Sequence, residues 1–303
     1  MTVQRPTTQR THLKRIHRDL AFTMALVLPG LIWFLVFNAY PALFSFWISF
    51  RDWKITGESE WVGLKNYLRV FKDPIILIAL RNTLIYALIT VLGQMAAGLG
   101  LALLVNQKVR FAGFFRLVYY FPVIASWVVV SLIFSFLFHS EGLINYVFSD
   151  LLRLYPPHRA WLNDPATALL AISLLGIWKG AGWTMLIYLA ALQSVPAELE
   201  EAARVDGAGG WQVRRFITIP LLRPASMFIA IMLTIGAFQS FIQFYIMTRG
   251  GPNHQTEVFL IYMYNQAFTF LDFGYASAIA FVLALIIVMI SAVQLRYFRA
   301  GAV

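Results

Sequence analysis

Six long apolar runs limit what this chain can fold into. They occupy approximately residues 20–36, 75–105, 117–138, 167–192, 225–247 and 275–295. A helix of about 20 apolar residues can cross the hydrocarbon core of a bilayer, and inside that core only helices and closed barrels satisfy their own backbone hydrogen bonds. The sequence therefore predicts an all-α fold, a polytopic membrane helix bundle with six transmembrane helices.

Composition agrees with this fold class, and local features refine it. Hydrophobic residues make up 60% of the 303 residues and charged residues 13%, whereas soluble domains carry about 25% charged residues. Pro41 interrupts the continuation of the first run, so the segment up to Phe50 either extends that span or lies at the membrane interface. Gly180 and Gly182 predict a broken or thinned helix in the fourth run, with backbone exposed in a cavity.

Basic residues are distributed unequally between the segments that flank the runs. The N-terminal tail, the second and fourth connections and the C-terminus carry 14 Lys and Arg, and the other three connections carry 8. Since basic residues concentrate on the cytoplasmic side of membrane proteins, both termini and the connection 193–224 are predicted to be cytoplasmic. The chain then divides into a basic cytoplasmic tail, 1–19, a six-span domain, 20–299, and a short cytoplasmic end, 300–303.

The connection 193–224 has the pattern of two short helices joined by a turn. Pro196 fits a first helical turn, and the acidic residues that follow it suit the positive end of the helix dipole. Gly207 permits a left-handed end to this helix, and a second short helix is expected from Trp211 to Pro220. On physical grounds alone, an ordinary solvated loop is the alternative.

Three polar residues inside the runs are candidates for a solute path. A lipid-facing ammonium near the middle of a span costs about 3 kcal/mol, so Lys179 either lines a water-filled path or binds a backbone carbonyl or carboxylate. Gln239 and Gln243 are four residues apart and are predicted to share a helical face, beside Phe238 and Phe241. Amides next to aromatic rings suit sugars, which offer hydroxyls at their edges and C–H groups on their faces. Hydrogen bonding between helices is the alternative for the glutamines.

Several other chemistries find no support in the sequence. It contains no GxxxxGK[ST] stretch for binding a nucleotide, no cysteine, and five histidines scattered without metal-ligand spacing. The net charge of +10 lies mostly at the ends of apolar runs, where it sets orientation in a lipid bilayer and does not indicate nucleic acid. The chain is therefore predicted not to be an enzyme and to hold no cofactor or metal of its own.

Residues of the connection 193–224 also match a known pattern. The matching positions are Glu201, Ala202, Ala203, Gly207, Ile217 and Pro220. Their spacing resembles the EAA loop of ABC importer permeases, a coupling helix–turn–helix that docks into a groove on a separate ATPase subunit. Ile219, where Leu is common in that family, is a tolerant difference.

The resemblance extends over nearly the whole chain. Motifs similar to those of the MalF-type permeases of carbohydrate ABC importers are AYP (39–41), VGLKNY (62–67), NT (82–83), ALQSVP (191–196), TRGGP (248–252) and FGYASA (273–278). TRGGP differs from the commoner TGGGP at Arg249. The resemblance implies a multi-pass permease of a prokaryotic inner membrane. Its implied partners are a second, related permease, two ATPase subunits that hold ATP and Mg²⁺, and an extracytoplasmic binding protein that delivers a sugar or oligosaccharide.

The resemblance also implies roles for particular residues. Those implied in coupling to the ATPase are Glu201, Ala202, Ala203, Asp206, Gly207, Ile217 and Pro220. Alignment on the loop places the family's sugar-contacting positions at Gly180, Trp183, Ile235 and Gln239, next to Lys179, and with Gln243 these form the predicted translocation path. Gly176 and Trp183 stand where maltose permeases have Asn and Tyr, which predicts a different sugar.

Two other functions remain open from the sequence. Lys179 would suit an anionic solute, such as a glycerol phosphate ester, carried by the same kind of permease. A self-contained transporter driven by an ion gradient is the alternative from another class. Such proteins use acidic residues inside their spans as ion sites, and the interiors of the six runs contain no Asp or Glu.

Overall fold

A computed structural model describes residues 22–54, 59–107, 110–154 and 159–300. The predicted tail 1–19 and the last three residues of the predicted end 300–303 lie outside this part. Most of the described chain is helical, and its strands are a short antiparallel pair, β1 (Arg51–Asp52) and β2 (Glu60–Trp61), with a single bridge between Lys54 and Asp272.

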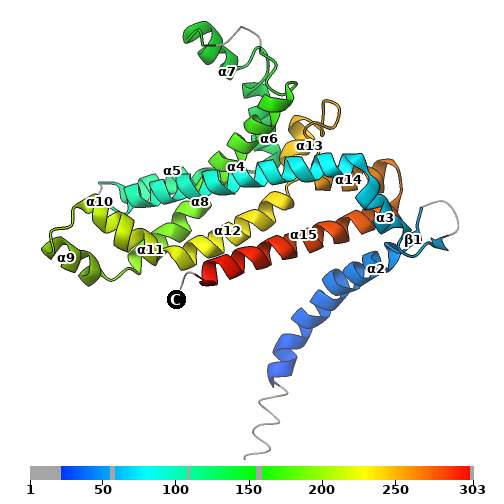
Figure 1. Ribbon diagram of the computed structural model, residues 1–303, viewed down its shortest axis with the longest axis horizontal. Helices are drawn as coiled ribbons and strands as arrows, with labels where there is room; N and C mark the ends of the chain where they lie inside the picture. Colours follow the sequence, from blue (N-terminus) through cyan, green and yellow to red (C-terminus); the bar gives the residue numbers. More distant parts are fainter. Residues whose placement is uncertain (1–21, 55–58, 108–109, 155–158, 301–303) are drawn as a thin grey trace, which may run out of the picture.

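Five helices run side by side and form the bundle (Figure 1). They are α4 (Pro74–Val105), α5 (Ala112–Ile124), α8 (Pro165–Gln193), α12 (Arg223–Phe238) and α15 (Phe273–Ala300). The shorter helices are α2 (Tyr40–Ile48), α3 (Lys65–Lys72), α6 (Trp127–Leu137), α7 (Leu143–Asn145), α9 (Ala197–Val205), α10 (Gly210–Val213), α11 (Ile219–Leu221), α13 (Ile242–Met247) and α14 (Phe259–Tyr264). Helices α9 to α11 lie at one end of the bundle and α3 with β1 at the other, whereas α2 and the α6–α7 branch leave it on opposite sides (Figure 1).

Several of the described helices are long enough to span a membrane. Four are long and apolar enough to cross a bilayer, namely Phe22–Ile48, α4, α8 and α15 as far as Phe298. Two bent pairs meet the same criterion together, α5 with α6 at 93° and Gly210–Leu221 with α12 at 62°. The described residues thus provide four spans, or up to six if each bent pair is one span. The predicted fold class, a polytopic helix bundle, is confirmed, and the number six stays a prediction.

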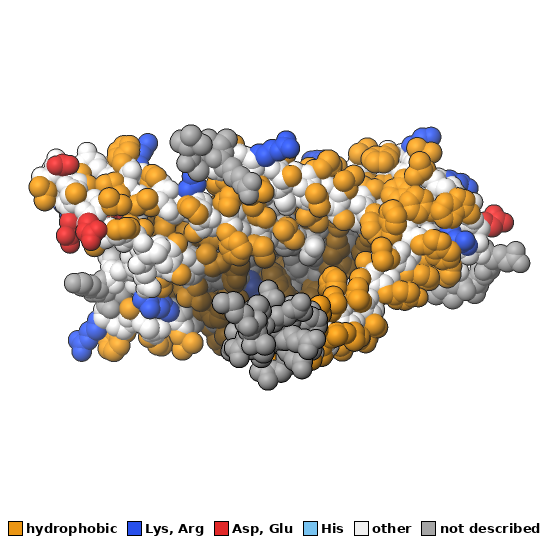
Figure 2. All heavy atoms as spheres, turned by 90° about the horizontal axis from the view of Figure 1, so that it is seen from below, with side chains coloured by type: hydrophobic (Ala, Val, Ile, Leu, Met, Phe, Trp, Pro, Cys, Tyr) orange, Lys and Arg blue, Asp and Glu red, His pale blue; other side chains and the backbone are white. Residues whose placement is uncertain are grey.

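Apolar side chains cover the middle of the face in Figure 2, and acidic side chains lie at its two ends. Inside the bundle, one apolar cluster near α9–α11 includes Met185, Tyr188 and Leu222. The other, toward α3, includes Phe244 and Tyr275. This pattern suits a bundle whose middle lies in hydrocarbon and whose ends lie in water.

Pro41 does not interrupt the first helix, contrary to the prediction. The helix runs from Phe22 to Ile48, with a π-helical segment, Leu35–Ala39, directly before α2 and Pro41 in the first turn of α2. The π-helical segment already interrupts the usual i→i−4 hydrogen bonds, so the missing N–H of the proline breaks no further bond.

The third and fifth runs are each divided, although both were predicted as continuous spans. In the third run, Ala125 and Ser126 are extended, with ψ of 143° and 134°, between α5 and α6. In the fifth run, α12 ends at Phe238 and α13 begins at Ile242, so Gln239 and Gln243 lie on either side of a break. The prediction that these two glutamines share a helical face is therefore wrong.

The predicted break at Gly180 and Gly182 is also wrong, because α8 is continuous. The two glycines instead allow close packing. A Cβ at Gly182 would overlap the main chain of α5 at Tyr119, and a Cβ at Gly180 would overlap the side-chain amide of Gln94 in α4. Small residues serve this purpose widely in membrane helices.

Candidate functional site

A cavity of about 490 Å³ lies where α4, α6, α12 and α13 meet. Its lining residues are Tyr86, Thr90, Gln94, Trp127, Met232, Leu233, Gly236, Ala237, Gln239, Ser240, Phe241, Ile242 and Gln243. These supply three amides, three hydroxyls and aromatic rings, and none carries a charge. The volume lies in the range of roughly 300–1,000 Å³ found for small-molecule sites. The arrangement can hydrogen-bond the hydroxyls of a solute and stack against its apolar faces.

The break between α12 and α13 places both glutamines at this cavity. The Gln243 side chain is buried, and its Nε2 donates to the Tyr86 hydroxyl at 3.0 Å. Ser240 Oγ donates to the main-chain carbonyl of Gly236 at 3.1 Å. This carbonyl lies in the last turn of α12, where carbonyls lack N–H partners from a following turn. Gln239, the residue after α12, is exposed, and its amide has no hydrogen-bond partner within the described chain. Gln239 is therefore the glutamine available to a solute.

The ammonium of Lys179 binds main-chain carbonyls and does not line this cavity. Its Nζ donates to the main-chain carbonyls of Pro122 (2.9 Å), Val123 (3.2 Å) and Ala125 (2.7 Å). Of the two interpretations that the sequence leaves open, the structure agrees with binding to backbone carbonyls. Lys179 is not among the residues that line the cavity.

Three other residues of the predicted path do not line the cavity. Gly180 faces the Gln94 amide, Ile235 is half-buried on α12, and Trp183 packs against Phe228, with ring centroids 6.4 Å apart. The lining residues that sequence reasoning missed include Tyr86, Gln94, Trp127 and Ser240. They come from different helices, and no local pattern connects them.

The connection 193–224 folds as two short helical segments. Pro196 stands directly before α9, not in its first turn, and Gly207 has φ of +86°, in agreement with the predicted left-handed end. The second segment runs from Gly210 to Leu221 and contains the π-helical stretch Arg214–Thr218. It ends one residue beyond Pro220 because the proline follows the π-helical stretch, where the i→i−4 pattern is already interrupted.

Internal contacts hold the two segments together and leave most of the predicted coupling residues accessible. Thr218 Oγ1 donates to Glu200 Oε1 at 2.9 Å and so joins the second segment to α9. The accessible coupling residues are Glu201, Ala202, Asp206, Gly207 and Pro220, while Ala203 and Ile217 are half-buried. Large apolar side chains are exposed beside them at Val205, Trp211 and Phe216. Exposed apolar side chains that lie together on a surface are typical of sites that contact another protein or a membrane.

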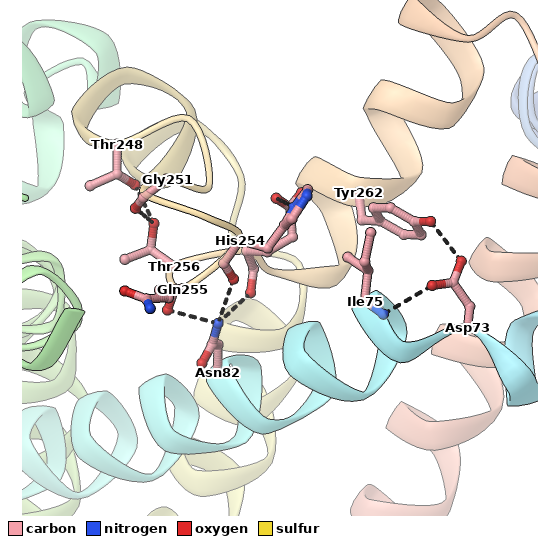
Figure 3. Close-up of polar contacts among 10 residues, drawn as sticks. Asp73, Ile75, Asn82, Thr248, Gly251, His254, Gln255, Thr256 and Tyr262 are labelled. Atoms are coloured by element: carbon pink, nitrogen blue, oxygen red, sulfur yellow. Dashed lines mark hydrogen bonds and ion pairs between the residues drawn. The ribbon is translucent and has the colours of Figure 1, made fainter.

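Several sequence motifs meet at the opposite end of the bundle (Figure 3). Asn82 Nδ2 donates to the carbonyls of Gln255 and Glu257, each at 3.0 Å, in the segment that follows TRGGP. Thr256 Oγ1 donates to the Gly251 carbonyl at 2.7 Å within that segment. The NT and TRGGP motifs therefore build the frame that fixes residues 248–257 on α4. Across the described residues, no group of three or more His, Asp or Glu could hold a metal ion.

Comparison with known proteins decides the family. Residues 89–299 match the family described as binding-protein-dependent transport system inner membrane component. The chain belongs to this family. As such it is an inner-membrane permease subunit of an ABC transporter and not an enzyme, since the ATPase of these transporters is a separate subunit.

Individual relatives resemble the permease over nearly its whole length. The probable ABC transporter permease protein YurN of Bacillus subtilis is 37% identical, over 91% of this chain and 95% of its own. The lactose transport system permease protein LacF of Rhizobium radiobacter is 33% identical, over 95% and 97%. A bacterial alginate ABC transporter, solved in complex with an alginate pentasaccharide-bound periplasmic protein, matches with a TM-score of 0.79 at 25% identity, over 93% of this chain and 94% of the other.

Proposed function

We propose that this permease passes a sugar or oligosaccharide that an extracytoplasmic binding protein delivers, and that a separate ATPase drives the transport through the connection 193–224. The observation that carries the proposal is the cavity of amides, hydroxyls and aromatic rings inside an apolar bundle. The names of relatives support it, since LacF is a lactose transport permease and a similar alginate transporter is involved in the import of an acidic polysaccharide. The periplasmic protein bound to that transporter supports a binding-protein partner for this chain.

The cavity favours an uncharged solute. None of its lining side chains is ionised, and the ammonium of Lys179, which would suit an anion, is held by three carbonyls. A cavity without charge leaves the negative groups of a phosphate ester without compensation, and their desolvation is costly. The glycerol phosphate alternative is therefore the weaker one.

The first helix supports a pairing with a second permease. None of the most apolar stretch of Phe22–Ile48 is buried, and the helix leaves the bundle at a wide angle (Figure 1). Its contacts to the bundle, such as Ser45 Oγ to Ser277 Oγ at 3.1 Å and the Phe46–Phe281 ring pair, lie near its C-terminal end. An apolar helix that stands apart gains packing from a neighbouring membrane subunit.

The connection 193–224 supplies the surface for the ATPase. The ATPase can bury the exposed apolar side chains of this connection, and a basic residue of the ATPase can pair with the exposed carboxylate of Glu201. Among the described residues no atom lies within 4 Å of a Cβ built at Gly207, so a side chain there would project toward the partner. The positive φ of Gly207, +86°, adds a backbone strain that glycine avoids. Rigid-body motion of the ATPase then reaches the cavity through α12, which follows this connection.

One experiment tests both parts of the proposal, using the whole transporter reconstituted in liposomes with its ATPase and binding protein. Gln239→Ala should lower sugar uptake roughly three- to tenfold, the value of one hydrogen bond of about 0.5–1.5 kcal/mol, at unchanged ATPase recruitment. Glu201→Lys and Gly207→Asp should abolish ATPase recruitment although the permease still inserts.

Matched controls make the outcome specific. Gln193→Ala removes a glutamine outside the cavity, and Glu141→Lys reverses an exposed charge outside the connection 193–224. Both should transport like the parent. Normal uptake by Gln239→Ala would show that the path lies elsewhere, and normal ATPase recruitment by the two loop variants would make the connection a simple linker.

A further inference from the structure

The charge of Lys179 has no role in the proposed transport, although it lies beside the cavity. The side chain is only 3% exposed near the middle of α8. Among the described residues no ion pair joins it to a carboxylate. Its three N–H groups instead meet the three carbonyls of Pro122, Val123 and Ala125. A charge kept in the interior of a membrane protein at such cost indicates a function.

Those three carbonyls belong to the C-terminal end of α5. The last carbonyls of any helix lack N–H partners from the following turn, and here the chain turns through 93° into α6, so the next residues cannot supply them. The ammonium takes the place of those partners at the negative end of the helix dipole. Lys179 is thus the contact that pins α8 to the α5–α6 bend.

The same ammonium contacts the residue that begins α6. Lys179 Nζ lies 4.8 Å from the ring centroid of Trp127, within the range of a cation–π interaction. Trp127 is half-buried and lines the cavity together with Gln239 and Gln243. The Lys179 side chain therefore contacts both the α5–α6 bend and the indole ring of Trp127, which lines the cavity directly after that bend.

We infer that Lys179 is a positioning residue for solute selection: its ammonium fixes the α5–α6 bend and thereby sets Trp127 as an aromatic wall of the cavity. Lys179 acts on the solute through Trp127 and does not touch it. The inference rests on the proposed passage of sugars through this cavity.

Sugar selectivity in a double-mutant cycle tests the inference. The reconstituted transporter is offered lactose and galactose separately, and the ratio of their uptake rates is compared at equal ATPase activity for Lys179→Met, Trp127→Ala and the double variant. Each single change should shift the ratio roughly three- to tenfold in the same direction, and the double variant should match Trp127→Ala. Arg81→Met, which removes an exposed cation from α4 outside the cavity, is the control and should leave the ratio unchanged.

A spectroscopic measurement separates positioning from general packing. In protein labelled with 5-fluorotryptophan, the ¹⁹F resonance of Trp127 is the one lost in Trp127→Phe. Lys179→Met should shift or broaden this resonance, and Lys179→Gln, which keeps two donors, should have a smaller effect. Arg81→Met should have none. Because Lys179→Gln keeps part of the hydrogen bonding, it also serves if Lys179→Met fails to assemble.

The outcomes distinguish this inference from the function on which it rests. If Trp127→Ala changes selectivity while the lysine variants change neither the ratio nor the resonance, the positioning role is wrong and the cavity assignment stands. Additive losses in the double variant would likewise overturn the positioning role. If Trp127→Ala itself leaves uptake and selectivity unchanged, the cavity is not the path, and both proposals fail.

Discussion

Asp73 shows how one side chain organises the end of the bundle near α3. It precedes α4, where Oδ1 accepts from the Ile75 N–H at 2.9 Å and Oδ2 accepts from the Tyr262 hydroxyl at 2.6 Å (Figure 3). Oδ2 also accepts from the Tyr275 hydroxyl at 2.7 Å. Partial burial opposes ionisation of this carboxyl. The hydrogen bonds from Tyr262, Tyr275 and the Ile75 N–H, with the charge of Arg69, outweigh burial and hold its pKa below the usual value. The ionised carboxylate therefore joins α4 to α14 and α15.

Replacing this charge should destabilise the permease independently of pH across the neutral range. A lowered pKa means that the stabilisation is fully present above the ordinary Asp pKa of 3.8 and is lost only as pH falls through the lower folded value. Asp73→Asn should cost about 1–3 kcal/mol, since neutral hydrogen bonds replace charge-assisted ones. Thermal unfolding of the purified transporter at pH 5 and pH 8 should show the same loss.

Asp164→Asn is the matched control for Asp73→Asn. Asp164 also precedes a helix, α8, and accepts from the Ala166 N–H at 3.1 Å. Because Asn caps a helix as well as Asp does, this change should cost little. Equal losses at the two positions would show that the two tyrosines add nothing to the role of Asp73.

Glu257 is a residue whose ionisation the fold opposes. Its side chain is buried, and Oε2 lies 2.9 Å from His254 Nδ1. Oε1 has no hydrogen-bond partner among the described residues. Burial raises the pKa of this carboxyl, and the hydrogen bond and charge of His254 offset part of the rise. A raised pKa means that the associated stability is present at low pH and is lost as pH rises through the folded value.

The Glu257→Gln variant should therefore gain stability relative to the parent protein as pH rises. The neutral amide avoids the cost of burying a charge, so the unfolding temperature of the variant relative to the parent should increase from pH 5 to pH 8. Because histidines titrate in the same range, the comparison is repeated in a His254→Gln background, where the increase should persist. A difference that does not change with pH would show that the fold does not raise the pKa of this carboxyl into the range from pH 5 to pH 8.

At the scale of helices, glycine positions decide how closely neighbours approach. Gly182 of α8 faces the main chain of α5, where an added Cβ would overlap Tyr119, whereas Gly100 of α4 has open space around its Cβ position. Gly182→Ala should lower the stability of the permease by about 1–3 kcal/mol through overpacking. Gly100→Ala, the control, should be neutral or stabilise by up to about 1 kcal/mol through helix propensity. Unfolding temperatures in detergent measure both, and similar values for the two variants would contradict the close contact.

The same scale shows where prediction from the sequence ends. Long helices such as α4 and α8 follow from average apolarity, because a bilayer requires only enough apolar residues in a row. The breaks depend on partners far along the chain. Lys179 binds carbonyls at the α5–α6 bend, and Gln243 leaves the α12 pattern to reach Tyr86. No local pattern signals such contacts, so the two short helices of the connection 193–224 and the place of Gln239 at the cavity could be predicted, whereas those of Trp127 and Tyr86 could not. The coupling role of that connection stays a prediction.

For the whole molecule, the remaining question is which end faces the cytoplasm. Helix α8 has 29 residues and is therefore about 44 Å long, more than the roughly 30 Å of a hydrocarbon core. Asn163 lies just before α8, and Gln212 lies in the connection that follows it. We therefore expect α8 to cross the membrane and the two positions to lie on opposite sides of it, whichever way the permease is inserted.

Cysteine labelling determines this orientation without interference, since the chain contains no cysteine. The excess of Lys and Arg in the tail and in the connection 193–224 predicts that this connection is cytoplasmic. An impermeant maleimide added to intact cells should label Asn163→Cys, and it should label Gln212→Cys only after the membrane is permeabilised. Both side chains are exposed, so a lack of reaction reports the membrane barrier and not burial. Labelling of Gln212→Cys in intact cells would reverse the orientation and place the proposed coupling surface on the side where no ATP is available.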